Sequence, residues 1–336
     1  MDSLTQIALG AAVGEATLGH RVGRKAAAWG AFLGTLPDLD VLFNPFLDAA
    51  QQLAIHRGFS HSFLVALVAA PVIGWLLHWL HEGRNPTASW KSWAALAWWC
   101  LVTHIVIDLF TVYGTQIFWP LTDHPFGLDA IFIVDPLYTL PLAAGLLTGL
   151  ISRRHRTAVW WGLAVSTTYL AWALTAKAWA HGAFKEGFDA QGIRVERMMS
   201  SPSPLNTVLW MGMAEADDTL WVATYSLLDS GPPTSAVAVP RRTAALDGHL
   251  QDRGVERLEW FSKGWWIADT SGVRPAIVDP RFGRSDLFLA DDGAWTFRFE
   301  LLADSTGAYH TFTELNPDVS GLDGLPERLW RRIQGH

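Results

Sequence analysis

The sequence has few charged residues. Asp, Glu, Lys and Arg make up only 17% of its 336 residues, whereas about a quarter is usual in a soluble globular protein. Half of the residues are hydrophobic, and the mean hydropathy of the chain is +0.18. This composition argues against an ordinary soluble protein and indicates a membrane protein, or a protein with one membrane part.

Cysteine and clustered positive charge are also scarce. Cys100 is the only cysteine, so no disulfide can form within the chain, and cysteine use gives no indication of the redox compartment. No basic cluster favours nucleic-acid binding. The net charge of −7 arises in residues 181–336, which hold 15 Lys/Arg and 22 Asp/Glu, because residues 1–180 hold ten of each. The chain therefore divides near residue 180 into an apolar part and an acidic part.

Long apolar segments recur through the first 180 residues. A membrane-spanning helix needs about 20 apolar residues. Six segments approach this length: 3–19, 26–43, 62–80, 93–112, 130–151 and 157–180. Buried helices of a soluble core are the alternative, but three of the segments (62–80, 93–112 and 130–151) are nearly free of charge. The sequence therefore predicts a polytopic α-helical membrane domain of about six helices over residues 1–180.

Basic residues between these segments predict the orientation of the chain. Cytoplasmic loops of membrane proteins carry an excess of Lys and Arg. Six alternating crossings would place eight basic residues on one side: Arg21, Arg24, Lys25, Arg84, Lys91, Arg153, Arg154 and Arg156. We expect this side to be cytoplasmic, so that the loops 44–61 and 113–129 and everything after residue 180 face outward.

The second part of the chain has the pattern of a β-rich domain. Residues 206–228 fit two apolar strands around an Ala-Asp-Asp turn, and GWWIAD and AWTFRFELL add strand-like runs rich in aromatic residues. A short helix fits near 325–334. We therefore expect a linker over 181–204, which ends in SSPSP, and a β-rich extracytoplasmic domain over 205–336.

Polar residues that suit a metal ion gather at the predicted outer ends of four apolar segments. They are Asp2 and Gln6, Asp38 and Asp40, His56 and His61, and His104 and Asp108. The basic loops alone determine the predicted orientation, and yet all four pairs fall on the outer face at similar depth. This agreement favours a common site.

The spacing and chemistry of these residues favour metal binding. His104 and Asp108 are four residues apart, which places them on one face of a helix. Gly58 gives the chain the freedom to turn between His56 and His61. Imidazole and carboxylate together suit zinc or another divalent transition metal. A bound cation would also offset the cost of placing a carboxylate in an apolar region, about 2.5–3.5 kcal/mol on insertion scales.

Each pair alone has a simpler explanation. The two aspartates after Pro37 could cap a turn at the membrane boundary, and His104 and Asp108 could form a structural hydrogen-bonded pair. A single histidine at this boundary is more often an interfacial residue than a ligand. Asp135 and His124 are further, weaker candidates near the same face. It is the whole set that predicts a metal site.

The motifs LPDLD, HRGFSHS and H-x-x-x-D, in this order, resemble those of the membrane-bound metal-dependent hydrolase family. Its best-known branch is the LexA-regulated, YdjM-like proteins of the bacterial inner membrane. The resemblance covers about residues 1–180 and implies this location for the chain. It also implies the metal ligands, which are here Asp38, Asp40, His56, His61, His104 and Asp108. One departure is Thr5-Gln6, where many members have Thr-His, so that Gln6 or Asp2 would complete the first cluster.

Two functions fit the sequence. In the first, the protein is a hydrolase in which one or two divalent ions lower the pKa of a bound water. Zinc is the expected ion, with manganese or another divalent ion as the alternative. Asp40 or Asp38 acts as general base, and Arg57 neutralises charge on a lipid-linked or phosphoester substrate. In the second, the protein is a non-enzymatic metal-binding scaffold or carrier whose outer domain binds a partner in the cell envelope. A structural zinc has four protein ligands, whereas a catalytic one keeps a position for water.

Overall fold

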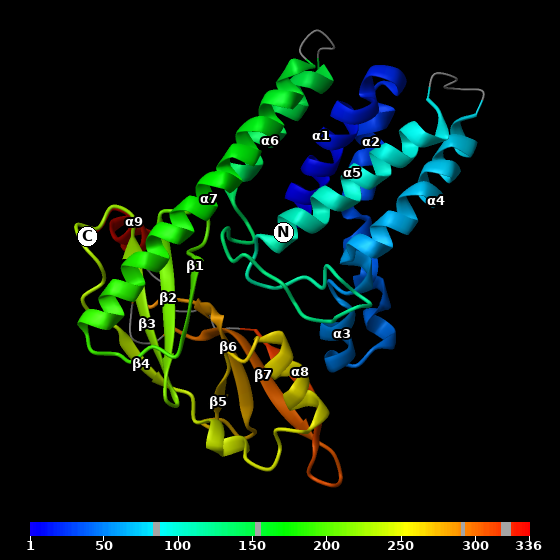
Figure 1. Ribbon diagram of the computed structural model, residues 1–336. Helices are drawn as coiled ribbons and strands as arrows, with labels where there is room; N and C mark the ends of the chain where they lie inside the picture. Colours follow the sequence, from blue (N-terminus) through cyan, green and yellow to red (C-terminus); the bar gives the residue numbers. More distant parts are fainter. Residues whose placement is uncertain (83–87, 152–155, 290–292, 317–323) are drawn as a thin grey trace. The chain divides into compact units, whose positions relative to one another are not determined.

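The computed structural model describes residues 1–82, 88–151, 156–289, 293–316 and 324–336 (Figure 1). Backbone contacts divide these residues into two compact units. Unit 1 comprises Met1–Pro45 and Ile55–Trp172, and unit 2 comprises Phe46–Ala54 and Ala173–His336. Arg84, Arg153 and Arg154, which enter the prediction of orientation, lie outside the described residues.

Unit 1 is built from helices. Its α-helices are α1 (Ser3–Val22), α2 (Lys25–Thr35), α4 (Phe63–His81), α5 (Trp90–Leu109), α6 (Pro136–Ile151) and the first part of α7 (Thr157–Ala190). Two 3-10 helices, η1 (Leu36–Phe46) and η2 (Phe59–His61), lie between α2 and α4. Asp2 is the N-cap of α1, because its carboxylate accepts a hydrogen bond from the Thr5 backbone N–H.

Helices α1 and α2 pack with their backbones in contact. A Cβ atom on Gly10 would lie 2.2 Å from the Gly30 carbonyl oxygen, and one on Gly14 would lie 2.3 Å from the Ala26 carbonyl oxygen. Only glycine permits so close an approach at these two positions, as in small-residue helix contacts within membranes. α1 also contacts α5 and α6, and most of its residues are buried. It is therefore the central helix of unit 1.

The prediction of six membrane helices is wrong. Within the described residues, only α4 and α5 are long and apolar enough to cross a bilayer. α1 has the length, but it is rich in Gly and Ala and packs against other helices of unit 1. α2 has 11 residues and α6 has 16, short of the roughly 20 that a bilayer core requires. α7 is longer, but polar and aromatic residues dilute its apolar stretch.

Helix α4 has the surface of a lipid-facing helix. Its large apolar side chains are exposed: Leu67 is 57% exposed, Val68 68%, Val72 60%, Trp75 61% and Trp79 60%. Soluble proteins rarely expose a contiguous apolar surface of this kind. α4 packs along α5, which is half buried. The two helices thus form one pair, with α4 on its exposed side.

Unit 2 contains two four-stranded antiparallel sheets. The first has the order β1 (Arg197–Pro202), β2 (Leu209–Ala216), β3 (Thr219–Ser226), β4 (Val237–Pro240). The second has the order β5 (Ile267–Asp269), β6 (Ala276–Arg284), β7 (Trp295–Ala303), β8 (Tyr309–Leu315). In both sheets each strand pairs with the next one along the chain. β2 and β3 lie within 206–228, where the sequence predicts two strands.

Helices complete unit 2. They are α3 (Ala49–Ile55, all but its last residue), the second part of α7, η4 (Thr243–Leu246), α8 (Arg253–Phe261) and α9 (Leu325–Ile333). Phe184 and Phe188 of α7 pack on Trp210 of the first sheet. Arg253 of α8 pairs with Asp48 at 2.8 Å, which ties the segment 46–54 to this unit. Residues 181–204, predicted as a linker, hold the end of α7 and strand β1.

We expect Gly30→Ala to lower the free energy of unfolding by about 1–3 kcal/mol, because its Cβ would lie 2.1 Å from the Gly10 carbonyl oxygen. The matched control is Gly182→Ala in α7, whose Cβ would meet nothing within 4 Å. This control should stabilise its helix by up to about 1 kcal/mol. Thermal unfolding of detergent-solubilised protein measures both changes. An unchanged midpoint for Gly30→Ala would contradict the close backbone contact.

Candidate metal site

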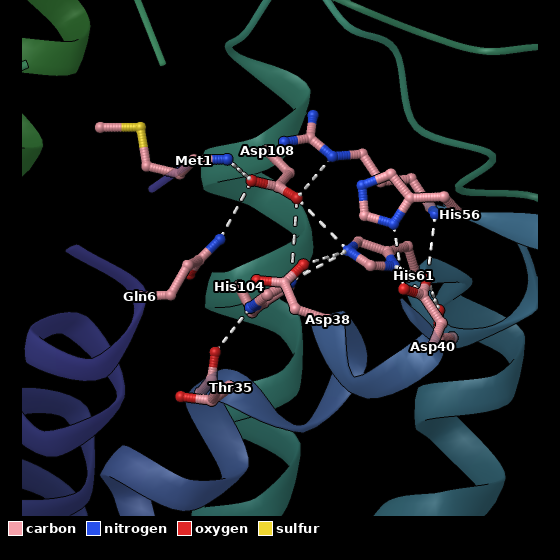
Figure 2. A network of polar contacts seen from close by, with 12 residues as sticks. Met1, Gln6, Thr35, Asp38, Asp40, His56, His61, His104 and Asp108 are labelled. Atoms are coloured by element: carbon pink, nitrogen blue, oxygen red, sulfur yellow. Dashed lines mark hydrogen bonds and ion pairs between the residues drawn. The ribbon is translucent and has the colours of Figure 1, made fainter. Parts of the chain in front are cut away.

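Four side chains of unit 1 converge from three segments of the chain. Asp38 comes from η1, His61 from η2, and His104 and Asp108 from α5. One potential ligand atom from each lies within 4.8 Å of those of the other three. Figure 2 shows the four side chains pointing toward one another. We refer to these residues as the four-residue cluster.

Local structure explains which residues enter the cluster. His104 and Asp108 are four residues apart on α5 and share one face of it, with His104 Nε2 3.7 Å from Asp108 Oδ2. η1 is a 3-10 helix, which has three residues per turn, so Asp38 and Asp40 point in different directions. Asp38 faces the two histidines of the cluster, whereas Asp40 faces His56.

The spacing of the ligand atoms fits one cation. His61 Nε2 lies 3.4 Å from Asp38 Oδ1 and 3.3 Å from Asp108 Oδ2. His104 Nε2 lies 3.0 Å from His61 Nε2 and 3.5 Å from Asp38 Oδ1. Ligands about 2.0–2.2 Å from a tetrahedral ion are about 3.3–3.6 Å from one another. The cluster is therefore close to the dimensions of a four-coordinate site.

Hydrogen bonds at the opposite ring nitrogens determine which nitrogen faces the cluster. His104 Nδ1 lies 2.6 Å from the Gly34 carbonyl oxygen, which can only accept, so this nitrogen carries the hydrogen. His61 Nδ1 lies 3.0 Å from Ser60 Oγ, whose own hydrogen goes to Asp40 Oδ2. In the neutral rings, both Nε2 atoms then carry a lone pair. Such bonds are the usual way in which metal-binding histidines are oriented.

The two Nε2 lone pairs face each other at 3.0 Å, and they repel unless a proton or a cation lies between them. Burial opposes a positive charge on His61, but the Asp108 and Asp38 carboxylates outweigh burial and raise the pKa of His61. Burial likewise opposes the charge of Asp38, but the imidazoles of His104 and His61 hold its pKa well below the ordinary value. The field that favours a proton at this place also favours a metal cation.

The two oxygens of Asp108 make different contacts. Its Oδ1 accepts hydrogen bonds from Gln6 Nε2 at 3.0 Å and from the Met1 amino group. Its Oδ2 is buried and accepts no hydrogen bond of good geometry from the part of the chain that the structure describes, but it lies 3.2 Å from Arg57 Nε and 3.3 Å from His61 Nε2. The chemistry of the donor set and the position of this oxygen among the four donors both fit a bound divalent ion.

Arg57 adds a buried positive charge beside the cluster. Its Nε lies 3.2 Å from Asp108 Oδ2, and its Nη1 donates to Thr111 Oγ1 at 2.9 Å. Its backbone N–H donates to Asp40 Oδ2 at 3.1 Å. These contacts hold Arg57 in the left-handed region, with φ of 55°, at a cost of about 1–3 kcal/mol. The left-handed residue of the HRGFSHS turn is thus Arg57, whereas Gly58 has a φ of −89°.

Asp40 and His56 form a second pair, which lies beside the cluster rather than within it. His56 Nδ1 lies 3.0 Å from Asp40 Oδ1. Burial opposes the charge of Asp40, but the hydrogen bond with His56 outweighs burial and lowers its pKa. The His56 side chain is 27% exposed, whereas that of Asp40 is fully buried. The sequence predicts both as metal ligands, and the structure places them in contact with each other, outside the four-residue cluster.

The weaker candidates have other partners. The Asp135 carboxylate accepts hydrogen bonds from the Tyr169 hydroxyl at 2.8 Å and from the Leu137 backbone N–H at 3.0 Å. His124 is exposed and packs edge-on against Phe126. Neither joins the four-residue cluster.

Two contacts of the site are made by residues that the sequence motifs do not include. The Gly34 carbonyl orients His104, and Thr111 receives the Arg57 guanidinium. A backbone carbonyl leaves no signal in a sequence, because any residue supplies one. Thr111 lies three residues after Asp108, one turn further along the chain, and this spacing is the signal that was available.

Comparisons with known proteins match only part of the chain. A family model described as YdjM inner membrane protein matches residues 1–180, which include the whole cluster. The "Uncharacterized protein YfhP" of Bacillus subtilis (strain 168) is 32% identical over 143 residues, 40% of this chain and 42% of that protein. The chain thus matches less than half the length of this relative. No solved structure matches the chain.

We expect purified wild-type protein to hold about one divalent ion per chain, and His61→Ala or Asp108→Ala to bind it at least about tenfold more weakly. Each substitution removes one donor from the cluster. Mass spectrometry of the metals in detergent-purified protein measures the ion content. The control is His124→Ala, which removes an exposed histidine and should keep the ion. Equal ion content in all four proteins would mean that the cluster binds no metal.

Proposed function

Because the chain belongs to the YdjM inner membrane protein family, we propose that it is a metal-dependent hydrolase of the bacterial inner membrane. The observation that carries the proposal is the four-residue cluster, in which two imidazole nitrogens and two carboxylate oxygens converge. This mixed donor set suits zinc, with manganese or another divalent ion as alternatives. Histidine and carboxylate ligands are combined in many hydrolytic zinc sites.

A divalent ion in the cluster would lower the pKa of a coordinated water toward 7 and would polarise an ester group. The residues of the chain handle the proton. His56, oriented by Asp40 through its Nδ1, accepts a proton from the attacking water at Nε2 and returns it to the leaving oxygen. The water oxygen forms a bond to phosphorus or to the carbonyl carbon, and the bond to the ester oxygen breaks.

The structure favours His56 over the aspartates as general base. Asp38 belongs to the cluster and is a candidate ligand. Both oxygens of Asp40 are engaged: Oδ1 contacts His56, and Oδ2 accepts hydrogen bonds from Ser60 and from the backbone of Arg57. A carboxylate held in this way orients an imidazole better than it abstracts a proton.

Arg57 supports the site electrostatically. Its guanidinium contacts Asp108 and Thr111, so it holds a candidate ligand in place. It also reduces the excess negative charge of the three carboxylates at the site, which would otherwise repel an anionic phosphoester or lipid-linked substrate. In the proposed reaction, the Arg57 guanidinium also contacts the negative charge that develops on the substrate.

The location of the site follows from the two candidate spans. The sequence between α4 and α5 contains Arg84 and Lys91, which favours the cytoplasm for this connection. His61 lies just before α4 begins, and Asp108 lies at the end of α5. Both are therefore at the outer boundary of the membrane. Because the connection between α4 and α5 is cytoplasmic in this orientation, the chain after α5 returns to the outer side, and the C-terminal part lies there.

One observation favours a second function. The cluster supplies four protein donors, which is the number that closes a structural zinc site. If all four bind the ion, the protein is a metal-stabilised scaffold or carrier without hydrolytic activity. Unit 2 is then the part that binds a partner in the cell envelope.

We expect metal-loaded wild-type protein to hydrolyse a nitrophenyl phosphoester or acyl ester, and His56→Gln to slow this about 10²–10⁴-fold. The ion content of His56→Gln should equal that of wild type, because His56 lies outside the cluster. His61→Ala should lose both activity and ion. The control is His81→Gln, a histidine of α4 that contacts Trp29 and Trp93. An ion-bound wild-type protein that cleaves no ester would support the scaffold instead.

A further inference from the structure

An apolar groove of about 370 Å³ begins beside the candidate metal site. It lies within unit 1, between η1, η2 and the first half of α4, with Leu101 of α5 also lining it. Its size falls in the usual range for a small-molecule pocket, about 300–1,000 Å³. Nothing in the proposed chemistry of the cluster requires such a groove.

The walls of the groove follow from the periods of two helices. Val65, Ala69 and Ile73 are four residues apart and form one face of α4. On the other side, η1 repeats every three residues, so that its residues form three columns. Two of these columns line the groove, and the third contains Asp38, which faces the cluster. One short helix thus separates the groove from the candidate ligands.

The groove has one polar end. Among its lining residues, Asp40 and Ser60 are the polar ones. Ser60 Oγ lies 3.0 Å from His61 Nδ1, and Asp40 contacts His56 at 3.0 Å. The polar end of the groove is therefore next to the proposed base and to the cluster. The remainder of the lining is hydrocarbon.

We infer that the groove binds the alkyl chain of an amphiphilic substrate, whose hydrolysable head group lies at the cluster. This inference rests on the proposed function. The shape requires a molecule with one polar and one apolar end, because a dissolved phosphoester would leave the apolar walls in contact with water. A chain from the membrane has direct access, since α4 is a candidate span and its neighbouring Leu67 and Val68 are exposed.

Chain length should therefore determine affinity. Each methylene that enters the groove should tighten binding about fourfold until the groove is full. For the same reason, short-chain esters should be hydrolysed, but more slowly than esters with a long alkyl chain. The groove thus narrows the substrate class from phosphoesters in general to lipids with an alkyl or isoprenoid chain.

The experiment uses the full-length, metal-loaded protein in phosphatidylcholine nanodiscs. The probe is an alkylphosphonate, whose phosphorus–carbon bond cannot be hydrolysed. It carries a photoactivatable diazirine at the end of its alkyl chain. Labelled peptides are identified by mass spectrometry. Butyl-, octyl- and dodecylphosphonate compete with the probe, and the ion content is measured on the same samples.

We expect labels within residues 36–43 and 65–73, with dodecylphosphonate the strongest competitor and butylphosphonate the weakest. Ala69→Phe should reduce labelling at least about tenfold, because its ring occupies the groove. Val68→Phe places the same aromatic ring on the exposed face of α4, and its labelling should equal that of wild type. Ala69→Leu, a smaller change, should have an intermediate effect, and unchanged ion content in each variant shows that the fold is intact.

Labels confined to the exposed side of α4, or equal labelling of Ala69→Phe and wild type, would overturn the inference. So would equal competition by the short and long phosphonates. The two proposals fail separately. Groove labelling in a protein that binds no ion contradicts the proposed function and supports the groove, whereas an ion-bound protein labelled only on its lipid-facing side contradicts the groove alone.

Discussion

The packing of unit 1 around the four-residue cluster depends on how the negative charge of its carboxylates is balanced. Asp108, His61 and His104 are completely buried, and the Asp38 side chain is 20% exposed. The Nε2 lone pairs of the two imidazoles are 3.0 Å apart. Burial of a charge is costly unless it is paired. Arg57 compensates only part of this charge, and it does so in a backbone conformation that ordinary residues avoid. A divalent ion would bind all four donors at once, and the chemistry proposed for the protein begins with this requirement.

The helix packing around the cluster serves the same end. A Cβ on Gly34 would lie 2.7 Å from the Gln6 carbonyl oxygen, so the two residues are held together where α1 crosses α2. Gly34 offers its carbonyl to His104, and Gln6 donates to Asp108. The close glycine contact therefore positions the partners of two candidate ligands. Through its Nε2, Gln6 thus contacts Asp108, one of the candidate ligands.

The sequence predicts the chemistry of the site better than its surroundings. The i, i+4 spacing of His104 and Asp108 is a local property of an α-helix, and it requires no knowledge of the fold. The division of labour between Asp38 and Asp40 could not be foreseen, because it depends on η1 being a 3-10 helix. The number of membrane helices fails for a different reason. The sequence does not tell whether an apolar residue packs on a neighbouring helix, as in α1, or faces outward, as in α4. Only the structure distinguishes the two cases.

The 3-10 geometry of η1 links the candidate metal site to the groove. With three residues per turn, Pro37, Asp40 and Phe43 fall in one column and Leu36 and Leu39 in the next, and all five line the groove. Asp38 occupies the remaining column and faces the cluster. An α-helix, with 3.6 residues per turn, would rotate these columns out of register within two turns. The same short segment therefore presents a candidate ligand to one side and an apolar wall to the other. A substrate chain held by the wall would bring its head group to the cluster.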